Sequence, residues 1–194
     1  MSKRIIHTYS LNQIQIQTGD IICTTDIELA IHAGQFWRLL GKLLPGSVDH
    51  IAIYIGPGGR CVESGVRGVT TFFLHERRWM AKKMVKYRGY FLDHLYGIAY
   101  PLRGREISKQ QETIIRGSVA EFCLAQAKAE KPYNINFLDS DTEESFYCSQ
   151  LAYKAYIKQG INLNTGVGIP DLPGTGAIVF PQEIWNACQH VRAN

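Results

Sequence analysis

The sequence lacks any apolar run long enough to cross a membrane, and it lacks a recognisable secretory signal peptide. Residues 1–7 carry charges, but no apolar stretch with a small-residue cleavage site follows them. We therefore expect no integral membrane segment and a cytoplasmic protein, with signal-independent export as the alternative. Internal repeats and low-complexity linkers are also missing. The 194 residues are most simply one domain, 1–194.

A strong excess of one charge is absent too: the net charge is +4, and charged residues make up 20% of the chain. We expect no nucleic-acid partner. One local basic cluster exists, whose members are Arg77, Arg78, Lys82, Lys83, Lys86 and Arg88. Over residues 82–88 the alternation of side chains is typical of a solvated strand face, and we prefer that interpretation to a site for an anionic partner.

The five cysteines lack the spacing of a disulfide framework or a zinc site, because their number is odd and no C-x-x-C pair occurs. We expect reduced thiols, no metal and no organic cofactor. Four of them lie in apolar strand or helix patterns and are explained by packing: Cys23, Cys61, Cys123 and Cys188.

What the chain does contain is the pattern of an α+β domain built on one antiparallel sheet packed against helices. Strands are predicted at 21–24, 50–56, 60–66, 69–74, 82–88 and 178–180. Helices are predicted at about 26–44, 106–130 and 146–159, with a last one starting at Pro181. The segments 75–105 and 160–180 are expected to carry loops that shape a cleft.

Cys148 differs from the other cysteines because it lies in the first turn of a predicted helix. With Ser145 as the N-cap, Cys148 would be the third helical residue, where unpaired N–H groups and the helix dipole favour an anion. This position lowers the pKa of a thiol, and a nearby imidazole would lower it further. Position alone leaves a nucleophilic and a merely buried Cys148 equally well supported.

His50 offers such an imidazole, at the start of the predicted strand 50–56. The isoleucines of this strand share one face, and His50 points to the other. A turn at 56–59 would pair Ala52 with Glu63, which makes His50 and Glu63 diagonal neighbours. The carboxylate would fix the ring tautomer and stabilise the imidazolium. The alternative is an exposed strand glutamate.

These segments together resemble a known family, the permuted NlpC-like cysteine hydrolases with a papain-like fold, and within it the YiiX/YebB-like branch. The resemblance rests on His50-Ile-Ala-Ile-Tyr-Ile-Gly, on Glu63-Ser-Gly-Val and on the helix start Tyr147-Cys-Ser-Gln-Leu-Ala-Tyr. Gly19-Asp and Lys131-Pro-Tyr-Asn also match. The similarity covers roughly residues 19–160.

The resemblance implies a circularly permuted papain-like fold in which the histidine strand precedes the cysteine helix. It implies Cys148 as nucleophile, His50 as general base and later acid, and Glu63 as the residue that orients the ring. The backbone N–H of Cys148 would contribute to the oxyanion hole. The expected substrate carries an amide bond, in a small peptide, a cell-wall fragment or an acyl amide.

Two alternatives stay open. The lecithin:retinol acyltransferase-like thiol enzymes have a similar histidine strand, but they carry a histidine where this chain has Glu63, so lipid acyl transfer or ester hydrolysis is the second interpretation. The third is a binding module that retains a papain-like cleft without the chemistry. The sequence indicates neither the substrate nor the oligomeric state.

Overall fold

A computed structural model describes residues 5–29, 46–89, 91–169 and 172–193. The chain has an α+β architecture centred on a six-stranded antiparallel sheet with the strand order β6-β5-β4-β3-β7-β8. Its strands are β3 (Ile21–Leu29), β4 (His50–Gly56), β5 (Arg60–Gly65), β6 (Gly68–Phe73), β7 (Phe91–Tyr100) and β8 (Gln189–Arg192). A separate hairpin is formed by β1 (Thr8–Leu11) and β2 (Ile14–Gln17).

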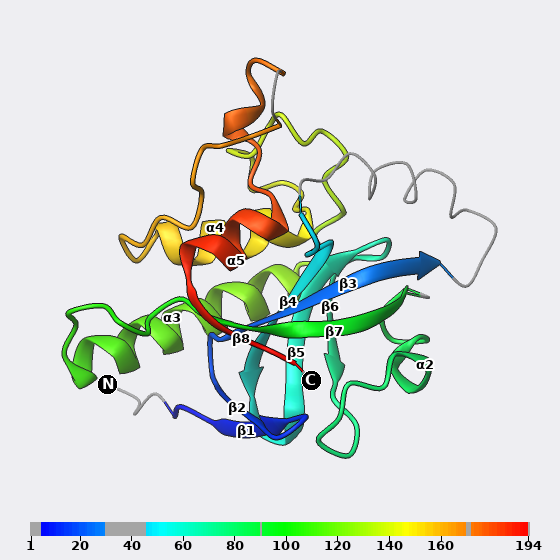
Figure 1. Ribbon diagram of the computed structural model, residues 1–194, viewed down its shortest axis with the longest axis vertical. Coiled ribbons are helices and arrows are strands. Elements are labelled where there is room, and N and C mark those ends of the chain that lie inside the picture. The colour runs from blue at the N-terminus through cyan, green and yellow to red at the C-terminus, as the bar shows by residue number, and fades with distance from the viewer. Residues whose placement is uncertain (1–4, 30–45, 90, 170–171, 194) are drawn as a thin grey trace.

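Both faces of the sheet are covered (Figure 1). On one face lie α3 (Lys109–Lys128), α4 (Cys148–Ile157) and α5 (Pro181–Ala187), which pack on Ile51, Ile53 and Val62. On the other face the β1–β2 hairpin and α2 (Ala81–Met84) pack against Ala52 and Tyr54. Every residue of β4 is consequently buried, so this strand lies at the centre of the molecule.

Local sequence signals explain the elements that flank the site. The strand β4 has the predicted bounds, β5 ends one residue earlier than predicted, and β6 begins and ends one residue earlier than predicted. Helix α3 begins after Ser108, whose side chain accepts from the N–H of Gln111 while the Gln111 side chain accepts from the N–H of Ser108. Within the described residues, no helix is both long and apolar enough to span a membrane.

The predicted strand at 82–88 is wrong. Residues 81–84 form α2, and the N–H of Arg88 donates to the carbonyl of Met84, one helical turn earlier. Met84 and Arg88 are both buried, whereas Lys86 and Tyr87 are exposed. The spacing of four residues between the buried side chains is helical, and the apparent alternation came from the basic residues between them.

Three further expectations are corrected. A helix starting at Asp26 is wrong, since β3 continues through Leu29; the rest of that predicted helix lies outside the described residues. Residues 178–180 lead into α5 outside any strand. The segment 75–105 is not only loop, because it contains β7, whose residues Ile98 and Ala99 are fully buried between β3 and β8.

Candidate active site

Cys148 is the first residue of α4, and Tyr147, in extended conformation, is its N-cap. Ser145 was predicted as the cap and lies outside the helix, so that prediction is wrong. The start of the helix is instead held by a residue inside it. The side-chain oxygen of Gln150 accepts from the N–H of Tyr147 at 3.2 Å and from the amide of Asn134 at 3.0 Å. Cys148 therefore lies even closer to the positive end of the helix than expected.

Hydrogen bonds hold the residues on either side of the thiol. The Ser64 hydroxyl on β5 donates to the carbonyl of Phe146 at 2.5 Å. On the other side, the Ser149 hydroxyl donates to the carbonyl of Val179 at 2.6 Å, and the N–H of Val179 donates to the Tyr147 hydroxyl at 3.1 Å. The start of α4 is thus tied to the sheet and to the segment before α5.

His50 and Glu63 meet on neighbouring strands, with Nε2 of the ring 2.8 Å from Oε2 of the carboxylate. The register pairs Ile53 with Val62, and its continuation places Ala52 opposite Glu63, as predicted. The turn differs from the predicted one: residues 57–59 form a 3-10 turn, and the register shifts between Tyr54 and Gly56. Glu63 is 0% exposed, which contradicts the alternative of an exposed strand glutamate.

The ring of His50 also hydrogen-bonds the Cys148 thiol, and the backbone of Ile51 hydrogen-bonds the sulfur. Because Nε2 faces Glu63, Nδ1 is the ring nitrogen left for the sulfur. Burial by itself would raise the pKa of the Cys148 thiol, but the charge and hydrogen bond of His50 outweigh it and hold the pKa below its ordinary value. Burial would likewise lower the pKa of His50, yet Cys148 and Glu63 raise it.

The other four cysteines show the opposite behaviour. Burial raises the pKa of the Cys123 and Cys188 thiols to about 12 and raises those of Cys23 and Cys61 as well. Exposure does not explain the contrast, because Cys188 is 8% exposed and Cys148 is 6% exposed. The imidazole beside Cys148 is the difference. None of the five cysteines forms a disulfide.

The sequence did not predict the cation that pairs with Glu63, which is Arg88. Arg88 is 1% exposed, and its guanidinium donates to Oε1 of Glu63 at 3.0 Å and to Oε2 at 2.9 Å. The same guanidinium donates to the two carboxylate oxygens of Asp93 at 2.7 and 2.9 Å. It also lies over the rings of Phe72 and Trp79. The expectation of a solvated basic face is therefore wrong for Arg88, and the helical spacing from Met84 was the available signal.

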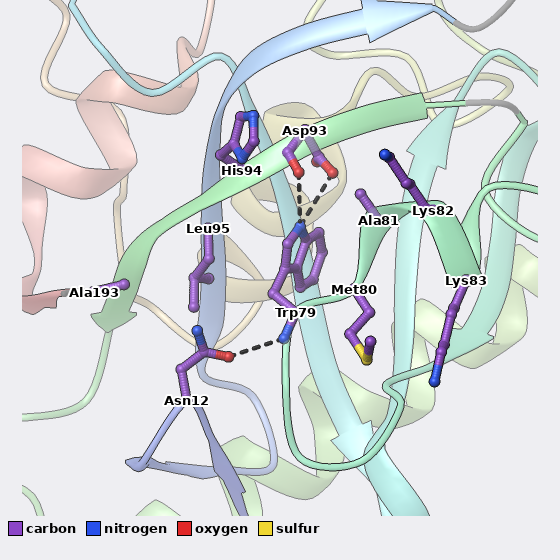
Figure 2. Close-up of a pocket in the computed structure, with 10 residues that line it drawn as sticks. All are labelled: Asn12, Trp79, Met80, Ala81, Lys82, Lys83, Asp93, His94, Leu95 and Ala193. Carbon is purple, nitrogen blue, oxygen red and sulfur yellow. Dashed lines mark hydrogen bonds between the residues drawn. The ribbon is translucent and has the colours of Figure 1, made fainter.

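Trp79 connects Asp93 to the surface of the molecule. Its indole N–H lies 3.2 Å from both the carbonyl oxygen and Oδ1 of Asp93. The two hydrogen bonds are drawn in Figure 2. Trp79 and Asp93 help to line a pocket of about 460 Å³ between α2, β7 and the turn at Asn12. Cys148, His50 and Glu63 are not among the residues that line this pocket.

One further polar group interacts electrostatically with Cys148. Burial, and then the charge interaction with Cys148, raise the pKa of the Tyr133 phenol, so its hydroxyl stays protonated at neutral pH. In the part of the chain that the structure describes, no group of three His, Cys, Asp or Glu residues is arranged to hold a metal ion.

The arrangement can generate a nucleophile, because a thiol in the first turn of a helix contacts an imidazole that a buried carboxylate orients. Comparison of the chain with known protein families, with curated proteins and with solved structures found no match.

Proposed function

We propose that this protein is a cysteine hydrolase that cleaves an amide bond through a thioester intermediate. The observation that carries the proposal is the contact between Cys148 and His50, in which the imidazole lowers the pKa of one thiol while the pKa of every other thiol is raised. A thiolate–imidazolium pair is the reactive form that nucleophilic thiol catalysis requires.

In the first half of the reaction the Cys148 thiolate attacks the carbonyl carbon of the amide. A carbon–sulfur bond forms, and the π electrons of the carbonyl move onto its oxygen. This oxyanion lies at the N-terminus of α4, where the unpaired N–H groups of the helix, including that of Cys148, offer stabilisation. The imidazolium of His50 then donates its proton to the nitrogen of the scissile bond, which breaks and releases an amine.

In the second half, water resolves the thioester. The neutral imidazole of His50 takes a proton from the water as its oxygen attacks the thioester carbon. Collapse of the tetrahedral intermediate expels the Cys148 thiolate and releases a carboxylic acid, which leaves His50 protonated as at the start. Glu63 holds the ring through both halves and stabilises its positive charge.

We further propose that the fold is the permuted papain-like fold of the YiiX/YebB-like branch. The order of elements supports this, because the histidine strand β4 and the glutamate strand β5 precede the cysteine helix α4. Helix α4 packs against both strands. The substrate class proposed with this family is a small peptide, a cell-wall fragment or an acyl amide.

The nucleophile can be tested without knowing the natural substrate. A small activated ester such as p-nitrophenyl acetate suits a nucleophile on a residue that is only 6% exposed. We expect acetylation of the Cys148 peptide, visible by mass spectrometry and removed by hydroxylamine, and amine release from some member of a panel of aminoacyl, peptidyl and fatty-acyl anilides. Both should disappear in Cys148→Ala and persist in Cys188→Ala.

The competing interpretations give different results in the same assay. Faster acylation of Cys148 by long-chain lipid esters than by aminoacyl donors, with transfer to an acceptor other than water, would favour the lipid acyltransferase. A protein that never acylates at Cys148, and whose biological activity survives Cys148→Ala, would be a binding module.

A further inference from the structure

Buried charges of alternating sign extend from the thiol across the sheet. Cys148 contacts His50, His50 contacts Glu63, Glu63 contacts Arg88, and Arg88 contacts Asp93. All five residues are less than 10% exposed. They come from α4, β4, β5, the turn after α2, and β7. The series of contacts therefore joins the face covered by α3, α4 and α5 to the face covered by α2 and the β1–β2 hairpin.

Within this series of contacts there are two carboxylates, Glu63 and Asp93, and one permanent cation, Arg88. Burial alone would raise the pKa values of Glu63 and Asp93, but interactions with Arg88, supplemented by His50, hold them below their ordinary range, so both are ionised at neutral pH. Arg88 carries a single positive charge and shares it between the two, with donor distances of 2.7–3.1 Å to their oxygens. The three side chains together therefore carry one net negative charge in a buried site.

A buried charge without a counterion is unfavourable. The nearest group able to balance the excess is His50, whose Nε2 lies 2.8 Å from Glu63 and which also interacts electrostatically with Asp93. Protonation of His50 neutralises the group of four. Were Asp93 uncharged, Arg88 and Glu63 would already neutralise each other, and the imidazolium would lose the counter-charge that supplements the Cys148 thiolate.

We propose that Asp93 is a positioning residue of the catalytic site that acts through Arg88. Its carboxylate neutralises part of the positive charge of Arg88, so that the negative charge of Glu63 can stabilise the imidazolium of His50. This inference rests on the proposed function, since it concerns the same thiolate–imidazolium pair. It assigns the Arg88–Asp93 pair a role in charge balance, in addition to its role in packing against Trp79 and Phe72.

Other titratable groups interact electrostatically with these five residues: Cys61 with Glu63, and Cys23, Tyr133 and Tyr147 with Cys148. Burial raises the pKa of each one, so all four are uncharged at neutral pH and do not alter the balance.

The test is the pH dependence of thiolate formation in Asp93→Asn. The substitution keeps the side-chain shape and an oxygen for the Trp79 N–H and for Arg88, while it removes the charge. The rate of carboxamidomethylation of the Cys148 peptide by iodoacetamide is followed by mass spectrometry from pH 4 to pH 10. Asp141→Asn is the matched control, because it makes the same change of net charge at a side chain that is 97% exposed.

In Asp93→Asn we expect the midpoint of Cys148 labelling to rise by about one pH unit, which is about a tenfold lower rate on the acidic limb. The control should follow the wild type. If Asp93→Asn is too unstable to titrate, both proteins are measured in sucrose, which favours the folded state.

A purely structural Asp93 predicts lower stability with an unchanged midpoint, and that result would overturn the inference while the proposed function stands. A wild-type protein with no Cys148 thiolate below the ordinary thiol pKa would overturn the proposed function, and this inference with it.

Discussion

The imidazole of His50 and the carboxylate of Glu63 are joined by a 2.8 Å contact from which solvent is excluded, since their side chains are 4% and 0% exposed. A charge-assisted hydrogen bond of this kind is stronger when water does not compete for it. It also fixes which ring nitrogen is left for Cys148. Glu63 therefore controls both the orientation of the ring and its tendency to hold a proton.

Replacing Glu63 with Gln retains the shape of the side chain and removes its charge. Loss of the counterion should lower the pKa of His50 by about 1–3 units and reduce amide hydrolysis by about 10²–10⁴-fold. Initial rates on the best anilide substrate measure the effect. Glu76→Gln is the control, because Glu76 is exposed and forms a surface ion pair with Lys83; equal rates in the two variants would show that Glu63 has no catalytic role.

The pH profile of hydrolysis should be bell-shaped. Activity requires the Cys148 thiolate, which forms above a lowered pKa, and the His50 imidazolium, which persists below a raised pKa. The rising limb should therefore lie below the ordinary thiol pKa, and the falling limb above the ordinary imidazole pKa; because the groups are coupled, both limbs describe the pair. In His50→Gln, burial again dominates at Cys148, so labelling of that thiol near pH 6 should vanish. Retained labelling would mean that His50 does not activate it.

Substitution by Gln should lower the stability of the protein strongly at one member of the basic cluster and hardly at all at another. Arg88→Gln leaves Glu63 and Asp93 buried without their shared cation, and we expect a loss of about 3–5 kcal/mol in the free energy of unfolding. Lys86→Gln alters an exposed side chain two residues away and should change that free energy by no more than about 0.5 kcal/mol. Urea unfolding compares them, and similar losses in both would contradict the buried network.

Gln150 should matter because its amide holds the turn before the nucleophile. Gln150→Ala leaves the buried N–H of Tyr147 without its acceptor, at about 1–3 kcal/mol, and removes one of the two acceptors of the Asn134 amide, which keeps the carbonyl of Asp139. We expect lower stability and slower alkylation of Cys148. Gln110→Ala on the exposed side of α3 is the control. Unchanged alkylation in Gln150→Ala would show that the turn needs no such support.

The sequence predicted the local positions of the candidate site residues more completely than it predicted the strands of the sheet around them. Cys148, His50 and Glu63 lie in segments whose local pattern determines their position, namely a helix start and a hairpin. Arg88 was assigned to a solvated face because its neighbours are basic, and its partner Glu63 is 25 residues away along the chain. Local periodicity carries no information about such a pairing.

The missed elements have similar causes. The strand β7 contains Asp93, His94 and Gly97, which interrupt the alternation expected of a strand. Asp93 is buried in spite of its charge because it pairs with Arg88. The start of α4 was misplaced because Gln150 caps it from inside the helix, whereas the prediction relied on the serine before it. In both cases tertiary contacts decide the local structure.

The most direct test of the account is competitive labelling of the intact protein with limiting iodoacetamide near pH 6, with each cysteine peptide quantified by mass spectrometry. Cys188 is the internal reference, because it is as accessible as Cys148 but has a pKa raised to about 12. We predict that Cys148 is labelled first and far ahead of Cys188. Labelling of Cys148 at a rate equal to or below that of Cys188 would contradict a thiolate–imidazolium pair at this site.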